Sequence, residues 1–296
     1  MLNLLLEPFE YNYMVKAILI SGIVGIVCAF LSAYLMLKGW SLMGDALSHS
    51  VVPGIAGAYA LSLPYSLGAF FSGILAALAI TLIRHISNLK EDAIIGFIFS
   101  TFFALGLLIL SLNPTSVNVQ TIIFGNILGI ANEDIIQIWI IAIISFIVLI
   151  FIWKNLLVVF FDENHALSIG LNPLKLKIIF FILLTACTVT ALQAVGSILV
   201  IAMVITPGAT AYLLTDQFNR LLLIAIIIGF ISSTVGAYTS YFINGATGGI
   251  IVIIQTIIFI FAFFFAPKYG LLIRYIKRNA KIINVITSLK EINSNE

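Results

Sequence analysis

Asp45 and His49 are the residues of this chain whose types and spacing point most plainly to chemistry. Between Lys38 and Arg84, Asp45 is the only side chain with a formal charge and His49 is the only histidine. On a helix, residues four positions apart project from one face, with their Cβ atoms about 5–6 Å apart. A carboxylate oxygen beside an imidazole nitrogen suits Mn, Fe or Zn. The pair therefore predicts a site for a divalent metal ion.

The same pair has two other interpretations, and the residues alone leave all three open. It would also serve as a structural Asp–His hydrogen bond near a helix start, with Asp45 partly capping the helix, or as a proton relay. A carboxylate in or near a membrane is costly unless it is paired, hydrated or bound to an ion. Two ligands are too few for a complete metal site, but a homodimer with this helix near its axis would bring four together.

Three neighbours of the pair are also polar or helix-breaking. Ser48 and Ser50 flank His49 and could form hydrogen bonds around the pair. Pro53, one turn further on, would disturb the ladder of helical hydrogen bonds. Broken helices are common where transporters place their binding sites, and an ordinary proline kink is the equal alternative.

A polar connection, VVFFDENHALSIGLNPLKLK, contains the second group of candidate residues: Asp162, His165, Ala166 and Gly170. Ala166 and Gly170 are four positions apart, so they would present a flat patch of small residues on a short helix. Gly170 and Pro173 would end this helix, as glycine and proline commonly do. We predict a short exposed helix that docks on a cytoplasmic partner, with an ordinary interfacial loop as the alternative. His165 is expected to be solvated or to face that interface, not to bind metal.

The elements that carry these residues are expected to lie in a membrane. Of the 296 residues, 62% are hydrophobic and 9% are charged, and the mean hydropathy is +1.20. A soluble domain carries roughly a quarter charged residues. The net charge of +2, without a basic cluster, argues against a nucleic-acid partner. No phosphate-binding loop and no hydrolase motif occurs, so the chain is predicted to be no enzyme and not to bind ATP itself.

Nine apolar stretches approach the length of about 20 residues that a membrane-spanning helix needs. They cover approximately residues 14–37, 42–62, 65–83, 93–112, 134–153, 176–192, 195–214, 220–240 and 247–266. Because some of them are closely joined, we expect an all-α, polytopic transmembrane bundle of eight or nine spans, with a short cytoplasmic coupling helix. Lysine and arginine occur in alternate connections, which the positive-inside rule places in the cytoplasm. This alternation favours nine spans with the N-terminus outside.

The expected organisation is one transmembrane domain, 14–267, between two short appendages. Residues 1–13 form an N-terminal extension that is retained, because acidic residues stand where a signal peptide would be basic. Residues 268–296 form a basic tail that is expected at the cytoplasmic membrane surface. Cys28 and Cys187 lie in apolar stretches and are interpreted as packing residues.

Five longer motifs give the chain a specific resemblance to a known family. They are LKGWSLMGDALSHSVVPG, KEDAIIGFIFS, IFGNILGI, LQAVGSILVIAMVITPGATAYLL and FFFAPKYGLL. The resemblance covers residues 13–271, most of the chain. It is to the metal-type ABC transporter permeases that import manganese, iron or zinc in bacteria, closest to the manganese and chelated-iron branch. It implies that 14–267 is the permease domain, in the bacterial cytoplasmic (inner) membrane.

The resemblance also implies partners, cargo and site residues. The chain would pair with itself or a close paralogue as a permease dimer, and each copy would dock a cytoplasmic ATP-binding subunit through the segment with Ala166 and Gly170. An extracytoplasmic metal-binding protein would deliver Mn, Fe or Zn as cargo, with no permanently bound cofactor and with ATP only on the partner subunit. Asp45 and His49 match the family's Asp-x3-His metal-contacting positions. Asn244 is neutral at a position that is often acidic, which leaves any second site open.

Three functions follow from these observations. The leading expectation is a binding-protein-dependent importer of divalent transition-metal ions, in which ATP hydrolysis in the partner drives alternating access. The alternative from another class is a proton-coupled secondary metal transporter, with Asp45 and His49 as the proton relay. A third keeps the ABC architecture and changes the cargo to an organic iron chelate, but a compact Asp–His pair argues for a bare ion.

Overall fold

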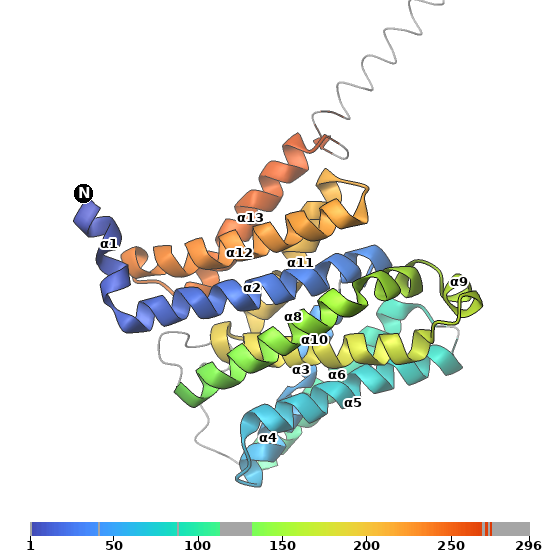
Figure 1. Cartoon of the computed structure of the whole chain (residues 1–296). Helices are drawn as coiled ribbons and strands as arrows, with labels where there is room; N and C mark the ends of the chain where they lie inside the picture. The colour runs from blue at the N-terminus through green and yellow to red at the C-terminus, as the bar shows by residue number, and fades with distance from the viewer. Residues whose placement is uncertain are drawn as a thin grey trace, which may run out of the picture.

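The computed structural model describes residues 2–40, 42–87, 89–112, 132–267, 270–271 and 273. Within these residues every regular element is an α-helix, which confirms the predicted all-α class. The helices labelled in Figure 1 are α1 (Leu2–Glu10), α2 (Asn12–Lys38), α3 (Met43–Ser50), α4 (Val52–Ala60), α5 (Tyr65–Ile86), α6 (Glu91–Leu112), α8 (Asn132–Phe161), α9 (Glu163–Ser168), α10 (Pro173–Val195), α11 (Ser197–Leu214), α12 (Phe218–Ile243) and α13 (Thr247–Phe265). The motif IFGNILGI and nearly all of the predicted tail 268–296 lie outside the described residues.

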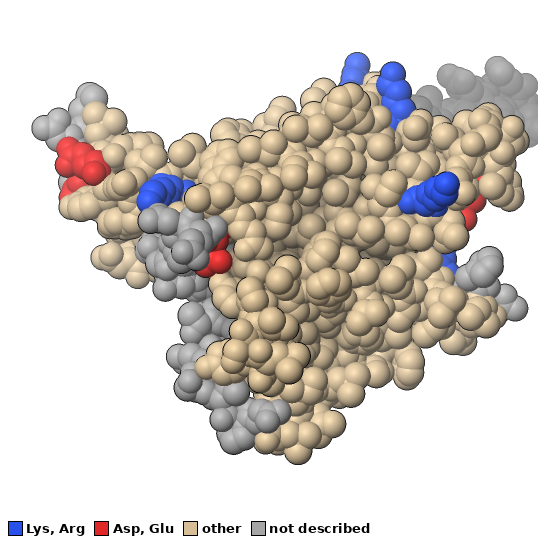
Figure 2. All heavy atoms as spheres, turned by 60° about the horizontal axis from the view of Figure 1, so that its bottom comes forward, with Lys and Arg blue, Asp and Glu red and all other residues tan. Residues whose placement is uncertain are grey.

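The described part of the chain contains seven helices long and apolar enough to cross a membrane: α2, α5, α6, α8, α10, α12 and α13. The other two predicted spans are shorter elements. Residues 195–214 form α11, and residues 42–62 form α3 and α4. Large apolar side chains such as those of Leu82, Phe151 and Phe265 are exposed, as expected where lipid is the solvent. In Figure 2 the coloured charged side chains lie toward the two ends and the broad middle is uncharged. The chain is a multi-pass membrane protein.

The span predicted at 42–62 is interrupted at its centre. Helix α3 ends at Ser50 and α4 begins at Val52, with Pro53 in its first turn. Proline lacks an N–H group and is tolerated in the first turn of a helix, so the chain starts a new helix there. The predicted disturbance at Pro53 is thus observed. Helix α3 packs against α5, α6, α10 and α11, so the interruption lies inside the bundle (Figure 1).

Glycines allow two pairs of helices to approach with their backbones in contact. A Cβ atom built on Gly25 of α2 would lie 2.6 Å from the carbonyl oxygen of Gly229 on α12, and one built on Gly229 would lie 2.5 Å from the carbonyl oxygen of Gly25. In the same way, a Cβ on Gly54 of α4 or on Gly68 of α5 would collide with the other's carbonyl. Small residues at such crossings are typical of membrane bundles. They hold α2 on α12 and α4 on α5.

The connections that carry lysine and arginine meet at one end of the bundle, which we call the basic end. Lys38 at the end of α2, Arg84 near the end of α5 and Lys177 near the start of α10 all lie within 4 Å of Glu163, at 3.7, 3.9 and 2.5 Å. The meeting of these connections agrees with the alternation read from the sequence.

The opposite end gathers the connections without lysine or arginine. Tyr65 donates a hydrogen bond to Asp134 across 3.3 Å, which joins the start of α5 to the start of α8. Helix α1 lies against the last turns of α12, where Tyr238 donates to the carbonyl oxygen of Leu5. Asn244 ends α12 in a left-handed conformation with φ 51°, which asparagine adopts more readily than most residues. Its place at the helix end gives this neutral residue a structural role.

Candidate functional site

Asp45 and His49 lie on one face of α3, as their spacing predicts. Nε2 of His49 is 3.3 Å from Oδ1 of Asp45. The neighbours Ala46, Leu47 and Ser48 are buried, whereas the side chains of Asp45 and His49 are 37% and 27% exposed. Both side chains are therefore partly accessible from outside a single copy of the bundle.

Two phenylalanines of α6 contact the imidazole of His49. The ring centroids of Phe99 and Phe103 lie 5.3 and 5.5 Å from that of His49, at interplanar angles of 64° and 78°. This edge-on arrangement is one that aromatic rings favour. Phe99 and Phe103 are one helical turn apart and stack on each other. Sequence reasoning missed both, because two phenylalanines in an apolar span carry no signal until the helix that they face is known.

Ser48 and Ser50 were expected to form hydrogen bonds around the pair. The Ser48 hydroxyl instead donates to the carbonyl oxygen of Gly44 in its own helix, across 2.7 Å. The Ser50 hydroxyl is buried without a hydrogen-bond partner, while its carbonyl oxygen accepts a bond from Ser72. The structure therefore places both hydroxyls close in sequence to His49 but bonds neither to the pair, and a supporting role for them stays a prediction.

A single copy of the chain supplies only two side chains to the predicted metal site. Among the residues that the structure describes, no group of three or more His, Cys, Asp or Glu side chains could hold an ion. Structural and catalytic zinc sites use about four ligands, and manganese prefers about six in an octahedral arrangement. Asp45 and His49 supply two side chains, so further ligands would have to come from a second chain or from water.

The predicted coupling segment forms a short helix, α9, with well-defined ends. Asp162 accepts hydrogen bonds from the N–H groups of Asn164 and His165, across 2.9 and 3.1 Å, and thereby caps the helix. An aspartate in this position satisfies donors that the first turn leaves unpaired. Gly170 has φ 82°, a left-handed conformation that glycine adopts without strain. These two residues set where α9 begins and where the chain turns away from it.

The side chains of the coupling segment do not all face outward. His165 and Gly170 are exposed, as expected. Ala166, however, is fully buried, because this face of α9 packs against α8 and α10. The expected flat patch shared by Ala166 and Gly170 is therefore corrected: Gly170 belongs to the surface and Ala166 to the packing beneath it.

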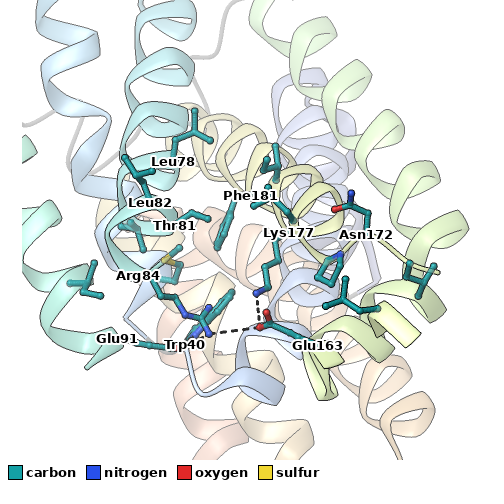
Figure 3. Close-up of a pocket in the computed structure, with 18 of the residues that line it drawn as sticks. Trp40, Leu78, Thr81, Leu82, Arg84, Glu91, Glu163, Asn172, Lys177 and Phe181 are labelled. Carbon is teal, nitrogen blue, oxygen red and sulfur yellow. Dashed lines mark hydrogen bonds and ion pairs between the residues drawn. The ribbon is translucent and has the colours of Figure 1, made fainter. Parts of the chain in front are cut away.

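Helix α9 borders a cavity of about 840 Å³ at the basic end. Figure 3 shows apolar side chains at one end of it, including Leu78, Leu82 and Phe181, and charged side chains at the other. The charged side chains belong to a set that we call the ion-pair cluster: Lys38, Arg84, Glu91, Glu163 and Lys177. In the sequence, the basic members indicate only which connections face the cytoplasm, and their spacing gives no sign that they meet.

The surroundings of Glu163 keep its carboxyl ionised. Burial alone would raise the pKa of this group, but the hydrogen bond and charge of Lys177, with the charges of Lys38 and Arg84, outweigh burial and hold the pKa below its usual value. At neutral pH Glu163 is therefore a carboxylate that faces three cationic side chains.

Comparison with known proteins places these features in a family. A model described as the ABC 3 transport family matches residues 10–266. The chelated iron transport system membrane protein YfeC of Yersinia pestis is 75% identical over 272 residues, which are 92% of this chain and 92% of that protein. The manganese transport system membrane protein MntB of Synechocystis sp. is 47% identical over 268 residues, or 90% of this chain and 88% of that protein.

A solved structure has the same fold. A chain of PsaBC from Streptococcus pneumoniae, determined in complex with a Fab, matches with a TM-score of 0.82 and 34% sequence identity. The match covers 94% of this chain and 100% of that chain. The likeness therefore extends over nearly the whole chain.

Proposed function

The chain belongs to the ABC 3 transport family and is a metal ABC transporter permease, and from this premise we propose that it imports manganese or iron as the bare divalent ion. The manganese and chelated iron transport systems named for its relatives support these two metals, and the compact Asp45–His49 pair favours the bare ion over a chelate. Zinc is also compatible with a carboxylate and an imidazole. The ion is cargo, and the permease needs no permanently bound cofactor.

The observation that carries this proposal is the Asp45–His49 pair on the partly exposed face of α3, in an interrupted span. The two ligand atoms are 3.3 Å apart, close enough to bind one ion together. Their contact is longer than the common N–H···O hydrogen bond of about 2.9–3.0 Å. The pair is thus not locked into a tight bond that an ion would have to break.

A second copy of the permease would complete the site. Two copies related by a twofold axis would contribute two carboxylates and two imidazoles. Four ligands suffice for zinc, and bound water or a bidentate carboxylate would fill the further positions that manganese prefers. A close paralogue with the same Asp-x3-His spacing would serve equally well as the second chain.

Energy for transport would come from an ATP-binding subunit docked at the basic end. This end faces the cytoplasm by the positive-inside rule. The partner would contact it through the exposed residues His165 of α9 and Gly170 of the turn that follows. ATP binding and hydrolysis in the partner would move the bundle between outward-facing and inward-facing states around the metal site. An extracytoplasmic metal-binding protein would deliver the ion at the opposite end.

The test is metal uptake by the reconstituted transporter. The permease would be placed in vesicles with its ATP-binding subunit and binding protein, and radioactive manganese and iron would be followed. Asp45→Asn and His49→Gln should each reduce uptake by more than roughly tenfold, because even groups that only support a metal ligand are worth about 10–100-fold. Asp92→Asn, which alters an exposed carboxylate on α6, is the matched control and should leave uptake unchanged.

Three results would contradict parts of the proposal. Normal uptake by both Asp45→Asn and His49→Gln would show that these two residues do not form the metal site. Uptake that depends on a pH gradient and not on ATP would show that the chain is a proton-coupled carrier and not part of an ATP-driven importer. Transport of an iron chelate without transport of the free ion would show that the cargo is the chelate and not the bare ion.

A further inference from the structure

Helix α9 has few connections to the helices that carry the metal site. Its main packing is against α8 and α10, its neighbours along the chain. On another side it borders the cavity of about 840 Å³, whose wall includes Leu167 and Leu171 of the coupling segment. Apolar packing therefore holds α9 mainly to its neighbours. A movement of α9 needs another route to reach α3 and α6.

Glu163, the first residue of α9, provides such a route through three cations. Its Oε1 atom lies 2.5 Å from Nζ of Lys177 on α10, 3.7 Å from Nζ of Lys38 on α2 and 3.9 Å from Nη2 of Arg84 on α5. Figure 3 shows Glu163 between Lys177 and Arg84 at the charged end of the cavity. One carboxylate thus connects the coupling helix to three membrane-spanning helices.

Arg84 continues the connection toward the metal site. Its Nη2 atom lies 2.6 Å from Oε1 of Glu91, the first residue of α6. Its guanidinium also lies over the ring of Trp40, 5.1 Å from the centroid, and the indole N–H of Trp40 donates to Glu91. Arg84, Glu91 and Trp40 therefore form one polar unit between α5, α6 and the segment that precedes α3.

Besides Glu163, Arg84 contacts Glu91 of α6 and Trp40 before α3, and both α6 and the Trp40 segment are connected to the Asp45–His49 pair. Helix α6, which begins at Glu91, carries the Phe99 ring that contacts His49. Trp40 accepts a hydrogen bond from the N–H of Met43, the first residue of α3 and two positions before Asp45. A shift of Arg84 would thus act on α3, which carries Asp45 and His49, and on α6, whose Phe99 ring contacts His49.

The two carboxylates compete for Arg84 at unequal distances. In this structure Arg84 is close to Glu91, at 2.6 Å, and distant from Glu163, at 3.9 Å. A displacement of α9 by little more than 1 Å would make the two contacts equal. Physical coupling between distant sites requires an element that can adopt two arrangements, and the two nearby carboxylates offer Arg84 two alternative partners.

We propose that Glu163 is a positioning residue that transmits the movement of α9 to the metal site through Arg84. This inference rests on the proposed function, because it assumes that α9 receives the movement of the ATP-binding subunit. Without the Glu163 carboxylate, the partner would still bind and hydrolyse ATP, but its movement would reach the metal site less often. The expected defect is therefore a loss of metal moved per ATP hydrolysed.

The test measures ATP hydrolysis and manganese uptake in the same vesicles of reconstituted transporter. Glu163→Gln keeps the shape of the side chain and removes its charge. It should lower the ratio of manganese moved to ATP hydrolysed by at least about fivefold, the lower range of common coupling effects. Arg84→Gln should do the same from the other side of the contact. Asp92→Asn, the exposed carboxylate used above, should leave the ratio unchanged.

The double variant separates a shared route from two independent defects. If Glu163 and Arg84 act through one contact, Glu163→Gln with Arg84→Gln should lower the ratio no further than the worse single variant. Losses that multiply would overturn the proposal. So would a fall of uptake and hydrolysis in equal proportion, since that is what loss of folded or assembled transporter produces.

The outcome of this test is distinguishable from that of the proposed function. If the unaltered transporter takes up manganese, Asp45→Asn abolishes uptake and Glu163→Gln keeps the normal ratio, then only the role of Glu163 is overturned. If the unaltered transporter moves no metal, the proposed function itself is overturned.

Discussion

The ring of Phe99 meets the imidazole of His49 edge-on, with 5.3 Å between the centroids and 64° between the ring planes. A histidine that binds a metal must present one nitrogen in a fixed direction, and other residues commonly hold the ring in place. Here two aromatic rings of a neighbouring helix contact the imidazole while its Nε2 atom faces Asp45. The orientation of the proposed ligand thus depends on how α6 packs against α3.

Phe99→Ala should weaken metal binding without removing a ligand. The His49 ring would gain rotational freedom, and the manganese concentration for half-maximal uptake should rise by roughly tenfold, the lower range for groups that support a ligand. Phe97→Ala, on the same helix but exposed, is the control and should leave that concentration unchanged. An equal change in both variants would show that the effect belongs to α6 in general.

The half-site in each chain predicts one metal ion for every two permease chains. Manganese bound to the purified assembled transporter, measured by equilibrium dialysis, should saturate at that ratio. The Asp45→Asn variant gives the background from ions held elsewhere. Saturation at one ion per chain would show that a single copy completes its own site.

Gly25→Ala should destabilise the bundle, because the added methyl group would lie 2.6 Å from the carbonyl oxygen of Gly229. Forcing an extra carbon into a closely packed contact costs about 1–3 kcal/mol. The free energy of unfolding should therefore fall, seen as a lower midpoint of thermal unfolding in detergent. Gly96→Ala is the matched control, since its Cβ would meet no atom within 4 Å. Alanine favours helix by up to about 1 kcal/mol over glycine, so this midpoint should be equal or higher.

The ion-pair cluster should make stability depend on pH in the acid range. The pKa of Glu163 is lower in the folded protein than its ordinary value of 4.5. Its contribution to stability is therefore fully present above that value and is lost as the pH falls through the lower, folded pKa. The difference in thermal midpoint between the unaltered protein and Glu163→Gln should be constant near neutral pH and shrink below pH 4.5. A difference that persists in acid would assign the effect of the variant to packing.

The membrane spans could be predicted because their cause is local. A helix in lipid must satisfy its backbone and present apolar side chains along its length, and both requirements are visible in a single stretch of sequence. The break at Pro53 was predictable for the same reason, since the missing N–H belongs to the residue itself. The Asp45–His49 pair follows from the spacing of two residues on one helix.

The contacts that position the site could not be predicted in this way. Phe99 is 50 residues from His49, and Glu163 is 79 residues from Arg84. Which residues meet across such separations is decided by how the helices pack, and that packing follows from many small contacts such as Gly25 on Gly229. The burial of Ala166 has the same origin: its small size was evident, but the helix face that it occupies was not.

The interruption between α3 and α4 divides one predicted span into two short helices that meet at Val51. Helix α4 is held against α5 by the backbone contact of Gly54 with Gly68. Helix α3 carries Asp45 and His49 and begins three residues after Trp40, which contacts Arg84 at the basic end. A bend at this place would let Asp45 and His49 tilt with α3 while α4 stays against α5. In the proposed importer, such a bend would let access to the ion change on one side of the membrane at a time, so that an ion could cross without an open pore ever forming.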